Sequence, residues 1–325
     1  MPYSVRCVRF FLVFWAFVGL SYGCKKTIQP KPKSTDSSSL HSSTDTLLIS
    51  PGTLYLLVDG NLEKVEANKS VTDWSTPIID GFGSYNSPLD FNAGNIYFGG
   101  LDGLAAYNYQ TGALNWMGSI PFDPGASTAS MYRGAAFQDS LVFYTGPTGV
   151  TDGGAQLYGN YQNNGNRLWA DLIDSAGNNT SDFNGIPFVN NGNVLTVTRG
   201  VDGNLAITAY NTSTGSRIWA TAENSQLSAE LHIANNYVYC ASGTDAFCYS
   251  TNDGSLQWQT DLQFPAITNS TSSTYTFVDG NQLIVSRNYG LTTNLIREIN
   301  ASTGVLMSSL EVDFPEAVAF NGLWI

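Results

Sequence analysis

Only two histidines occur in this 325-residue chain, so the chemistry open to its side chains is narrow. His41 lies in a Ser/Thr-rich stretch, and His232 lies in a segment with the pattern of a strand. A histidine-based triad or a histidine-rich metal site cannot be built around one folded histidine. A calcium site of loop carboxylates stays open, although no EF-hand spacing supports it. We therefore interpret His232 as a packed or pore-lining side chain and predict no resident metal.

Cys240 and Cys248 flank a short turn centred on Thr244. If the strands on either side of this turn pair symmetrically, the two cysteines lie opposite each other. Their Cα atoms would then be about 4.5–5.5 Å apart, which a disulfide can bridge. Because exported proteins fold in an oxidising setting, the sequence predicts a disulfide here, with two buried thiols as the alternative.

Cys24 follows a segment with the order of parts of a secretion signal. Two arginines precede the apolar run FFLVFWAFVGL, and its 11 residues fall short of the roughly 20 that a bilayer span needs. The sequence LSYGC resembles a bacterial lipoprotein box, in which a small residue precedes an acylated cysteine. Ser21 stands where that box usually has an apolar residue, so cleavage after Gly23 without acylation is the alternative. We expect a signal peptide over residues 1–23 and lipidation of Cys24.

Residues 24–46 are rich in Lys, Pro, Ser and Thr and contain almost no large apolar side chain. Such a segment cannot repay the entropy of ordering, so we predict a flexible tether. Residues 47–325 hold eight Lys and Arg against 24 Asp and Glu, a formal net charge of −16. A domain this acidic repels nucleic acid and anionic membrane surfaces, which excludes both as direct ligands. The charge serves solubility or, alternatively, a basic partner.

A glycine- and tryptophan-containing motif is repeated along the chain. Four strong copies of the motif are AYNYQTGALNW (106–116), GNYQNNGNRLW (159–169), AYNTSTGSRIW (209–219) and CYSTNDGSLQW (248–258). In each copy a tryptophan follows a glycine by four residues, giving the pairs Gly112 and Trp116, Gly165 and Trp169, Gly215 and Trp219, and Gly254 and Trp258. Two weaker copies flank them, one with Ser70 before Trp74 and one with Ser308 after Gly304. The turn positions are 39–53 residues apart, which is the spacing of propeller blades.

Each repeat is predicted to form four strands joined by hairpins. A β-branched or alternating run such as NIYFGG or VLTVTR precedes each motif, and a further short strand with an Asn/Gly turn precedes most of these runs. The glycine supplies a positive φ for the last turn, and the tryptophan buries a large flat surface. The sequence therefore predicts an all-β fold, a β-propeller of four-stranded antiparallel blades.

This motif resembles the PQQ-like repeat of quinoprotein-type β-propellers, and the resemblance spans residues 47–325. It implies that each tryptophan wedges one blade against the next. The chain is also similar to the propeller lipoprotein family of the outer-membrane β-barrel assembly machinery, whose members usually have eight blades. That similarity implies a non-catalytic scaffold for another envelope protein, lipid-anchored in the cell outer membrane or, alternatively, periplasmic or secreted. A propeller that binds a glycan or another small ligand is a second hypothesis.

A quinoprotein oxidoreductase is a third hypothesis. Enzymes of that kind need metal-binding carboxylates and amides around a central cofactor, commonly an adjacent pair of cysteines, and often a Cys-x-x-Cys-His haem site. The chain has neither an adjacent cysteine pair nor the haem motif. Because fold resemblance does not carry activity with it, we expect no enzyme and no cofactor.

The number of blades depends on the last ten residues, EAVAFNGLWI. They match the first strand, the Asn-Gly turn and the start of the second strand of a blade. Lending this segment to the first blade closes a ring of six blades, whereas counting it separately gives seven. We favour six, because ring closure removes exposed sheet edges.

Long loops single out one face of the propeller for binding. The connections between second and third strands, and from one blade to the next, share one face and include several segments of ten or more residues. Repeat proteins commonly carry insertions on the binding face. The candidate binding residues in these loops are Asp80, Asp123, Tyr132 and Asp152.

Overall fold

The protein is described by a computed structural model that places residues 53–58, 60–66, 71–78, 89–100, 103–119, 134–147, 154–174, 185–224, 227, 231–265, 274–289, 293–313, 319–320 and 323–324. All of these lie in one of the two compact units into which the chain divides, Ser38–Ile325. The expected signal peptide and tether over residues 1–46 lie outside them. The described part is all-β and contains no helix, as the sequence predicts.

Six successive groups of strands form the blades, numbered here in chain order. Blade 1 has three strands, β1 (Thr53–Val58), β2 (Asn61–Glu66) and β3 (Val71–Pro77). Blade 2 consists of β4 (Asp90–Asn92), β5 (Asn95–Gly100), β6 (Gly103–Asn108) and β7 (Leu114–Ser119). Blade 3 consists of β8 (Ala135–Gln138), β9 (Leu141–Pro147), β10 (Ala155–Tyr161) and β11 (Arg167–Asp174).

Blades 4 to 6 repeat the plan. Blade 4 consists of β12 (Phe188–Asn190), β13 (Asn193–Arg199), β14 (Leu205–Asn211) and β15 (Arg217–Ala220). Blade 5 consists of β16 (His232–Ala234), β17 (Tyr237–Ala241), β18 (Asp245–Ser250) and β19 (Leu256–Asp261). Blade 6 consists of β20 (Thr274–Asp279), β21 (Gln282–Tyr289), β22 (Thr293–Asn300) and β23 (Leu306–Asp313).

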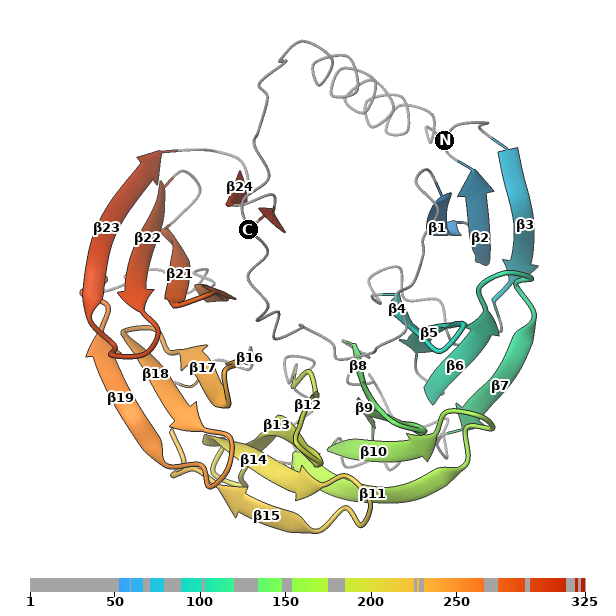
Figure 1. Cartoon of the computed structure of the whole chain (residues 1–325), viewed down its shortest axis with the longest axis horizontal. Coiled ribbons are helices and arrows are strands. Elements are labelled where there is room, and N and C mark those ends of the chain that lie inside the picture. The colour runs from blue at the N-terminus through green and yellow to red at the C-terminus, as the bar shows by residue number, and fades with distance from the viewer. Residues whose placement is uncertain are drawn as a thin grey trace. The chain divides into compact units, whose positions relative to one another are not determined.

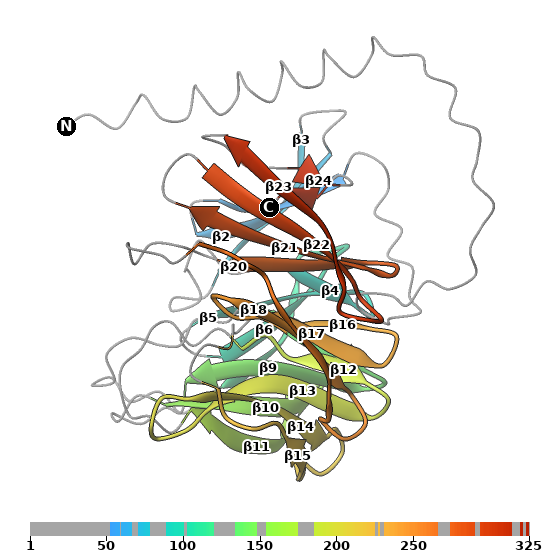
Figure 2. The same cartoon turned by 90° about the vertical axis from the view of Figure 1, so that its left-hand side faces the viewer.

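Successive blades follow one another in sequence order, and within each blade neighbouring strands pair antiparallel (Figure 1). Turned by 90°, the long strands run across the view (Figure 2). Blades 3 and 4 are also joined, because Asp174 at the end of β11 pairs in parallel with Arg199 at the end of β13. The prediction of a propeller with four-stranded antiparallel blades is thus confirmed for blades 2 to 6.

The C-terminal segment forms a hairpin of β24 (Ala319–Phe320) and β25 (Leu323–Trp324). Among the described strands these two pair only with each other. The expected pairing of this segment with blade 1 is therefore not seen among the described strand pairs.

Local turn chemistry explains the hairpins. In blade 4, Asn190 pairs with Asn193 across a two-residue turn in which Asn191 and Gly192 have φ angles of 49° and 78°. Two successive positive φ angles define the turn that matches the natural twist of paired strands. Asparagine and glycine tolerate this conformation better than other residues, so the sequence fixes the register here.

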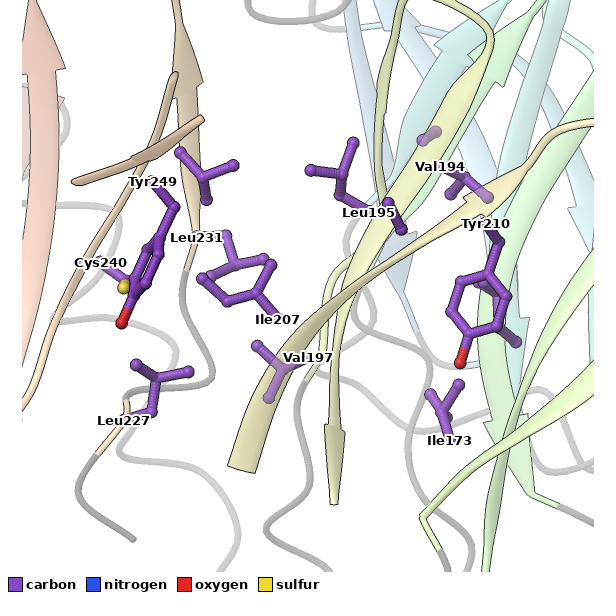
Figure 3. Packing of buried hydrophobic residues seen from close by; sticks show 14 of the residues in the cluster. Ile173, Val194, Leu195, Val197, Ile207, Tyr210, Leu227, Leu231, Cys240 and Tyr249 are labelled. Atoms are coloured by element: carbon purple, nitrogen blue, oxygen red, sulfur yellow. The ribbon is translucent and has the colours of Figure 1, made fainter. Parts of the chain in front are cut away.

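The core lies between blades. Middle strands such as β14 are buried on both faces, whereas last strands such as β15 and β19 are largely exposed. The largest cluster of buried residues runs from Phe143 of blade 3 through blade 4 to Val238 of blade 5. Figure 3 shows part of it, with Val197 and Ile207 of blade 4 beside Leu231. The blades are therefore held together by side chains of residues far apart in the sequence.

Candidate functional site

Five tryptophans lie against glycines of the following blade. A Cβ atom added at the glycine would overlap the indole in each pair, namely Gly112 with Trp74, Gly165 with Trp116, Gly215 with Trp169, Gly254 with Trp219 and Gly304 with Trp258. All five glycines have φ angles of 70° to 72°. Only glycine meets both demands, a left-handed backbone and no side chain against the indole. We call each such contact an indole wedge.

Hydrogen bonds fix four of the five indoles. In each, the ring N–H donates to the carbonyl oxygen three residues before the contacted glycine. These bonds are Trp116 to Gln162 at 2.5 Å, Trp169 to Thr212 at 2.8 Å, Trp219 to Thr251 at 3.2 Å and Trp258 to Ala301 at 2.9 Å. No sequence pattern marks these acceptors, because every residue has a backbone carbonyl whatever its type.

The contact between blades 1 and 2 differs. The carbonyl oxygen of Tyr109 corresponds to the four acceptors, but it accepts a bond of 3.2 Å from the hydroxyl of Tyr55. The buried Nε1 of Trp74 has no hydrogen-bond partner. The first wedge therefore packs like the others but lacks their hydrogen bond.

In three of the five blades an asparagine holds the turn that carries the glycine. The Oδ1 atom of Asn211 accepts bonds of 3.0 Å from the backbone N–H groups of Ser213 and Thr214, and the N–H of Gly215 donates to the Asn211 carbonyl at 2.9 Å. Asn108 and Asn300 make the same side-chain contacts in blades 2 and 6. These turns present the glycine to the preceding blade in a fixed geometry.

The cysteines of blade 5 do not face each other as the sequence predicts. Cys240 pairs with Phe247, and Cys248 pairs with Tyr239. The ladder is offset by one residue from the symmetric pairing expected about Thr244, so the two side chains lie on opposite faces of the sheet. Both thiols are free and buried, and burial raises the pKa of each. The expected disulfide is therefore wrong, and the alternative of two buried thiols describes this structure.

Alkylation tests this register. Denatured, non-reduced protein treated with iodoacetamide is expected to carry the label on both Cys240 and Cys248, as read by peptide mass spectrometry. A sample reduced before alkylation serves as the control and should give the same labelling. If both cysteines were protected from the label in the non-reduced sample alone, the two would form a disulfide after all.

His232 lies in β16, the first strand of blade 5, beside β20 of blade 6. Burial lowers the pKa of His232 to about 4, and a hydrogen bond with the backbone of Thr276 opposes this shift. The imidazole is therefore neutral in the folded protein at pH 7. It packs between blades, which agrees with our interpretation of His232 as a packed or pore-lining side chain.

The His232 shift predicts a pH dependence of stability. An unfolded histidine binds its proton near pH 6.5, whereas the folded His232 does so only near pH 4. Between these values the unfolded state binds more protons, so stability is full above pH 6.5 and falls by roughly 2–3 kcal/mol on the way to pH 4. Urea unfolding of wild type and of His232→Asn at several pH values measures the difference. If the free energy of unfolding fell equally with pH in the two proteins, a lowered pKa of His232 would be contradicted.

The proposed binding residues Asp80, Asp123, Tyr132 and Asp152 lie outside the described residues. The described part of that face consists of strand ends and short connections. Asp174 and Arg199 meet there at 3.8 Å, and the Asp174 side chain is only 3% exposed. Since a buried charge without its partner is costly, this pair ties blade 3 to blade 4.

Two buried arginines approach one aromatic ring at the same end of blades 5 and 6. The Cζ atoms of Arg287 and Arg297 lie 5.5 Å and 4.9 Å from the ring centre of Phe264. Arg297 donates to the carbonyl oxygens of Leu262 at 2.8 Å and Gln263 at 3.4 Å, and Arg287 donates to Gly243. Both arginines therefore anchor connections that emerge on the proposed binding face. Sequence reasoning missed this cluster, because its members are isolated in the chain.

No three His, Cys, Asp or Glu residues of the described part are grouped so that they could hold a metal ion. A search of the same part for a helix long and apolar enough to cross a membrane finds none.

Comparison with known proteins gives one family match. A family model described as outer membrane protein assembly factor BamB matches residues 201–309. No curated protein matches the sequence significantly. The match covers the last motif-bearing blades, in which the wedges of Trp219 and Trp258 lie.

Several solved structures share the fold at low sequence identity. BamB from Moraxella catarrhalis has a TM-score of 0.55 and 14% identity, over 83% of this chain and 76% of that one. A europium-containing methanol dehydrogenase has a TM-score of 0.59 and 11% identity, over 83% and 71%. Quinohemoprotein alcohol dehydrogenase from Comamonas testosteroni has a TM-score of 0.56 and 11% identity, over 82% and 60%. The chain is thus similar in fold both to an assembly factor and to dehydrogenases.

Two kinds of residue could serve the cofactor chemistry of such dehydrogenases, namely grouped metal ligands and a cysteine motif. The described part offers no grouped His, Cys, Asp or Glu ligands for a metal, and the sequence has neither an adjacent cysteine pair nor a Cys-x-x-Cys-His motif. Residues 47–325 contain two cysteines, Cys240 and Cys248, and these point to opposite faces of one sheet. The propeller fold is common to both groups of proteins, but the dehydrogenase ligand set is not found in the described part.

Proposed function

We propose that the protein is a non-catalytic cell-envelope scaffold, whose propeller binds another envelope protein during outer-membrane assembly. The observation that carries this proposal is the match of residues 201–309 to the BamB family model. The fold similarity to BamB of Moraxella catarrhalis over 83% of the chain supports it. The five indole wedges suit such a role, because blades locked to one another form a rigid platform for a partner.

The partner would bind the face that carries the long loops, through Asp80, Asp123, Tyr132 and Asp152. Residues 47–325 have a formal net charge of −16, so electrostatic complementarity favours a partner with a basic surface. The buried arginines and the Asp174–Arg199 pair keep positive charge at this face inside the fold, where it is already in contact with carbonyls and a carboxylate. We expect complex formation to weaken as salt concentration rises.

Crosslinking and pull-down from native membranes tests the scaffold proposal. A stoichiometric protein partner that is lost in the variant with Asp80, Asp123 and Asp152 all changed to Asn supports it. A variant with three aspartates or glutamates changed outside these loops, Asp73, Glu298 and Glu311 to their amides, is the matched control and should keep the partner. Absence of any partner, combined with binding on a glycan array, would favour the small-ligand propeller instead. Turnover of an alcohol by protein loaded with quinone cofactor would overturn the non-catalytic assignment.

We further propose that Cys24 is acylated and holds the protein at the outer membrane. The support is the lipoprotein-like sequence LSYGC followed by the Lys-rich tether. Labelling with tritiated palmitate should depend on Cys24, and Cys24→Ser should release the protein from the membrane fraction. Retention of Cys24→Ser on the membrane would contradict lipidation. Several acyl chains at about 0.8 kcal/mol per buried methylene would make the anchor firm.

A further inference from the structure

The first residues of four outer strands occupy the same place in successive blades. The strands β7, β11, β15 and β19 lie on the outer side of blades 2 to 5 (Figure 1). Each begins two residues after a wedge glycine, at the end of the blade opposite to the long connections. The four first residues, which we call the rim row, are all exposed and are Leu114, Arg167, Arg217 and Leu256.

The two arginines of the rim row differ from the other cations that the structure describes. Of six described Lys and Arg residues, two form ion pairs and two are buried against backbone carbonyls, namely Lys64, Arg199, Arg287 and Arg297. Arg167 and Arg217 are exposed instead. No carboxylate oxygen of a described residue lies within 4 Å of either guanidinium. The rim row therefore places two positive charges in solvent on neighbouring blades.

The surroundings of the two guanidiniums are partly ordered. The Cζ atom of Arg167 lies 5.7 Å from the centre of the Tyr158 ring, so the side chain is held against an aromatic face. In blade 4, burial raises the pKa of Tyr210, while the charge of Asp171 raises it further and that of Arg217 lowers it. Asp171 therefore reduces the positive potential at Arg217 without forming an ion pair with it. A held guanidinium loses little freedom when it binds a carboxylate.

Apolar side chains flank the two arginines. Leu114 and Leu256, at the two ends of the rim row, are 41% and 51% exposed. Ile218 follows Arg217 and is 46% exposed, and Tyr161 at the end of β10 is 38% exposed. Arginine and aromatic residues are enriched in protein interfaces, and neighbouring exposed apolar side chains mark interaction sites. The rim row thus has the composition of a surface that binds another protein.

We propose that the rim row binds a segment of a partner protein in which two carboxylate side chains lie between apolar ones. The carboxylates contact Arg167 and Arg217, and the apolar side chains contact the two leucines. Charge complementarity favours this occupant, because the guanidiniums are exposed and unpaired in a domain of formal net charge −16. The same net charge repels an anionic membrane, which meets the whole domain and not the rim row alone. The surface lies opposite the long loops, so this inference does not depend on the proposed scaffold function.

Photocrosslinking in intact cells tests this surface on the full-length chain. The variant Ile218→p-benzoylphenylalanine is expected to link to one protein, and peptide mass spectrometry should place the link in a segment with two carboxylates beside apolar residues. The matched control is Val201→p-benzoylphenylalanine, which is 81% exposed at the opposite end of blade 4 and should not link to that segment. No link at position 218, a link to a segment without carboxylates, or a link to a second copy of this chain would overturn the proposal.

A fluorescein-labelled synthetic peptide of the linked segment tests the role of charge. Arg167→Gln with Arg217→Gln should raise the Kd about tenfold in fluorescence anisotropy, because both ion pairs are lost. Arg167→Lys with Arg217→Lys keeps both charges and is the control, with a Kd expected within about threefold of wild type. An equal Kd for the glutamine variant and wild type would overturn the proposal. Retention of wild type on phosphatidylglycerol vesicles, without binding of the peptide, would assign the rim row to a membrane instead.

Discussion

Replacing Trp116 with alanine is expected to lower the free energy of unfolding by about 3–5 kcal/mol. The indole is 7% exposed, and its centre lies 5.9 Å from that of the Tyr97 ring. Its N–H donates to the carbonyl of Gln162 at 2.5 Å, and the ring lies against Gly165 of blade 3. Alanine removes this packing and the hydrogen bond and leaves a cavity between two blades. Urea unfolding followed by circular dichroism measures the change.

Met117 provides the matched control for Trp116. It is the next residue of β7, points to the other side of the strand and is 38% exposed. Met117→Ala should change the unfolding free energy by no more than about 0.5 kcal/mol. Trp116→Phe keeps a ring in the wedge but removes the donor, so it should fall between the two. A midpoint for Trp116→Ala within error of that for Met117→Ala would contradict the wedge.

Replacing Gly165 with alanine is expected to lower the unfolding free energy by about 2–5 kcal/mol. The backbone φ of 70° costs an L-residue roughly 1–2 kcal/mol. The added methyl group would also overlap the indole of Trp116, and overpacking of this kind costs about 1–3 kcal/mol. The midpoint of urea unfolding should fall with little change in its slope.

Gly192 separates the two contributions. Its φ is 78°, but nothing lies within 4 Å of the site of its missing Cβ. Gly192→Ala should therefore show only the backbone cost of about 1–2 kcal/mol. In the double variant Trp116→Ala with Gly165→Ala, the space left by the indole admits the methyl group, so the combined loss should be smaller than the sum. Strict additivity would mean that the two residues do not act through one contact.

The fold was accessible from the sequence because the signal is local and repeated. A glycine followed by a tryptophan four residues later, with β-branched runs before them, marks one hairpin, and its recurrence marks a propeller. The contacts between blades were less accessible. Trp169 meets Gly215 and the Thr212 carbonyl more than 40 residues away, and only the three-dimensional arrangement brings them together.

The register of blade 5 shows why local symmetry can mislead. Pairing about Thr244 would have placed Cys240 opposite Cys248. The ladder instead pairs Ala241 with Ala246, and this shift of one residue sends the two thiols to different faces. The geometry of the turn sets the register of the two strands. Where the turn has no Asn-Gly pair, the sequence does not determine that register.

The candidate site was accessible only in part, for a similar reason. Loop length indicated one face of the propeller, but not which buried groups support it. Arg287, Arg297 and Phe264 come from two blades, and no spacing in the sequence connects them. Their role depends on backbone carbonyls, which every residue possesses.

The unpartnered indole of Trp74 has a mechanical consequence. Tension applied to the protein through its N-terminal residues reaches β1 and blade 1 before any other described strand. Blade 1 meets blade 2 at the one wedge whose ring N–H makes no hydrogen bond, and there the hydroxyls of Tyr55 and Thr76 donate to carbonyls of blade 2 at 3.2 Å and 2.8 Å instead. Because these hydroxyls can rotate away while a wedged indole cannot, we expect this seam to yield under load before the four whose indole carries the bond. A pulling experiment would then record one early rupture of low force, and the remaining blades would stay intact behind it.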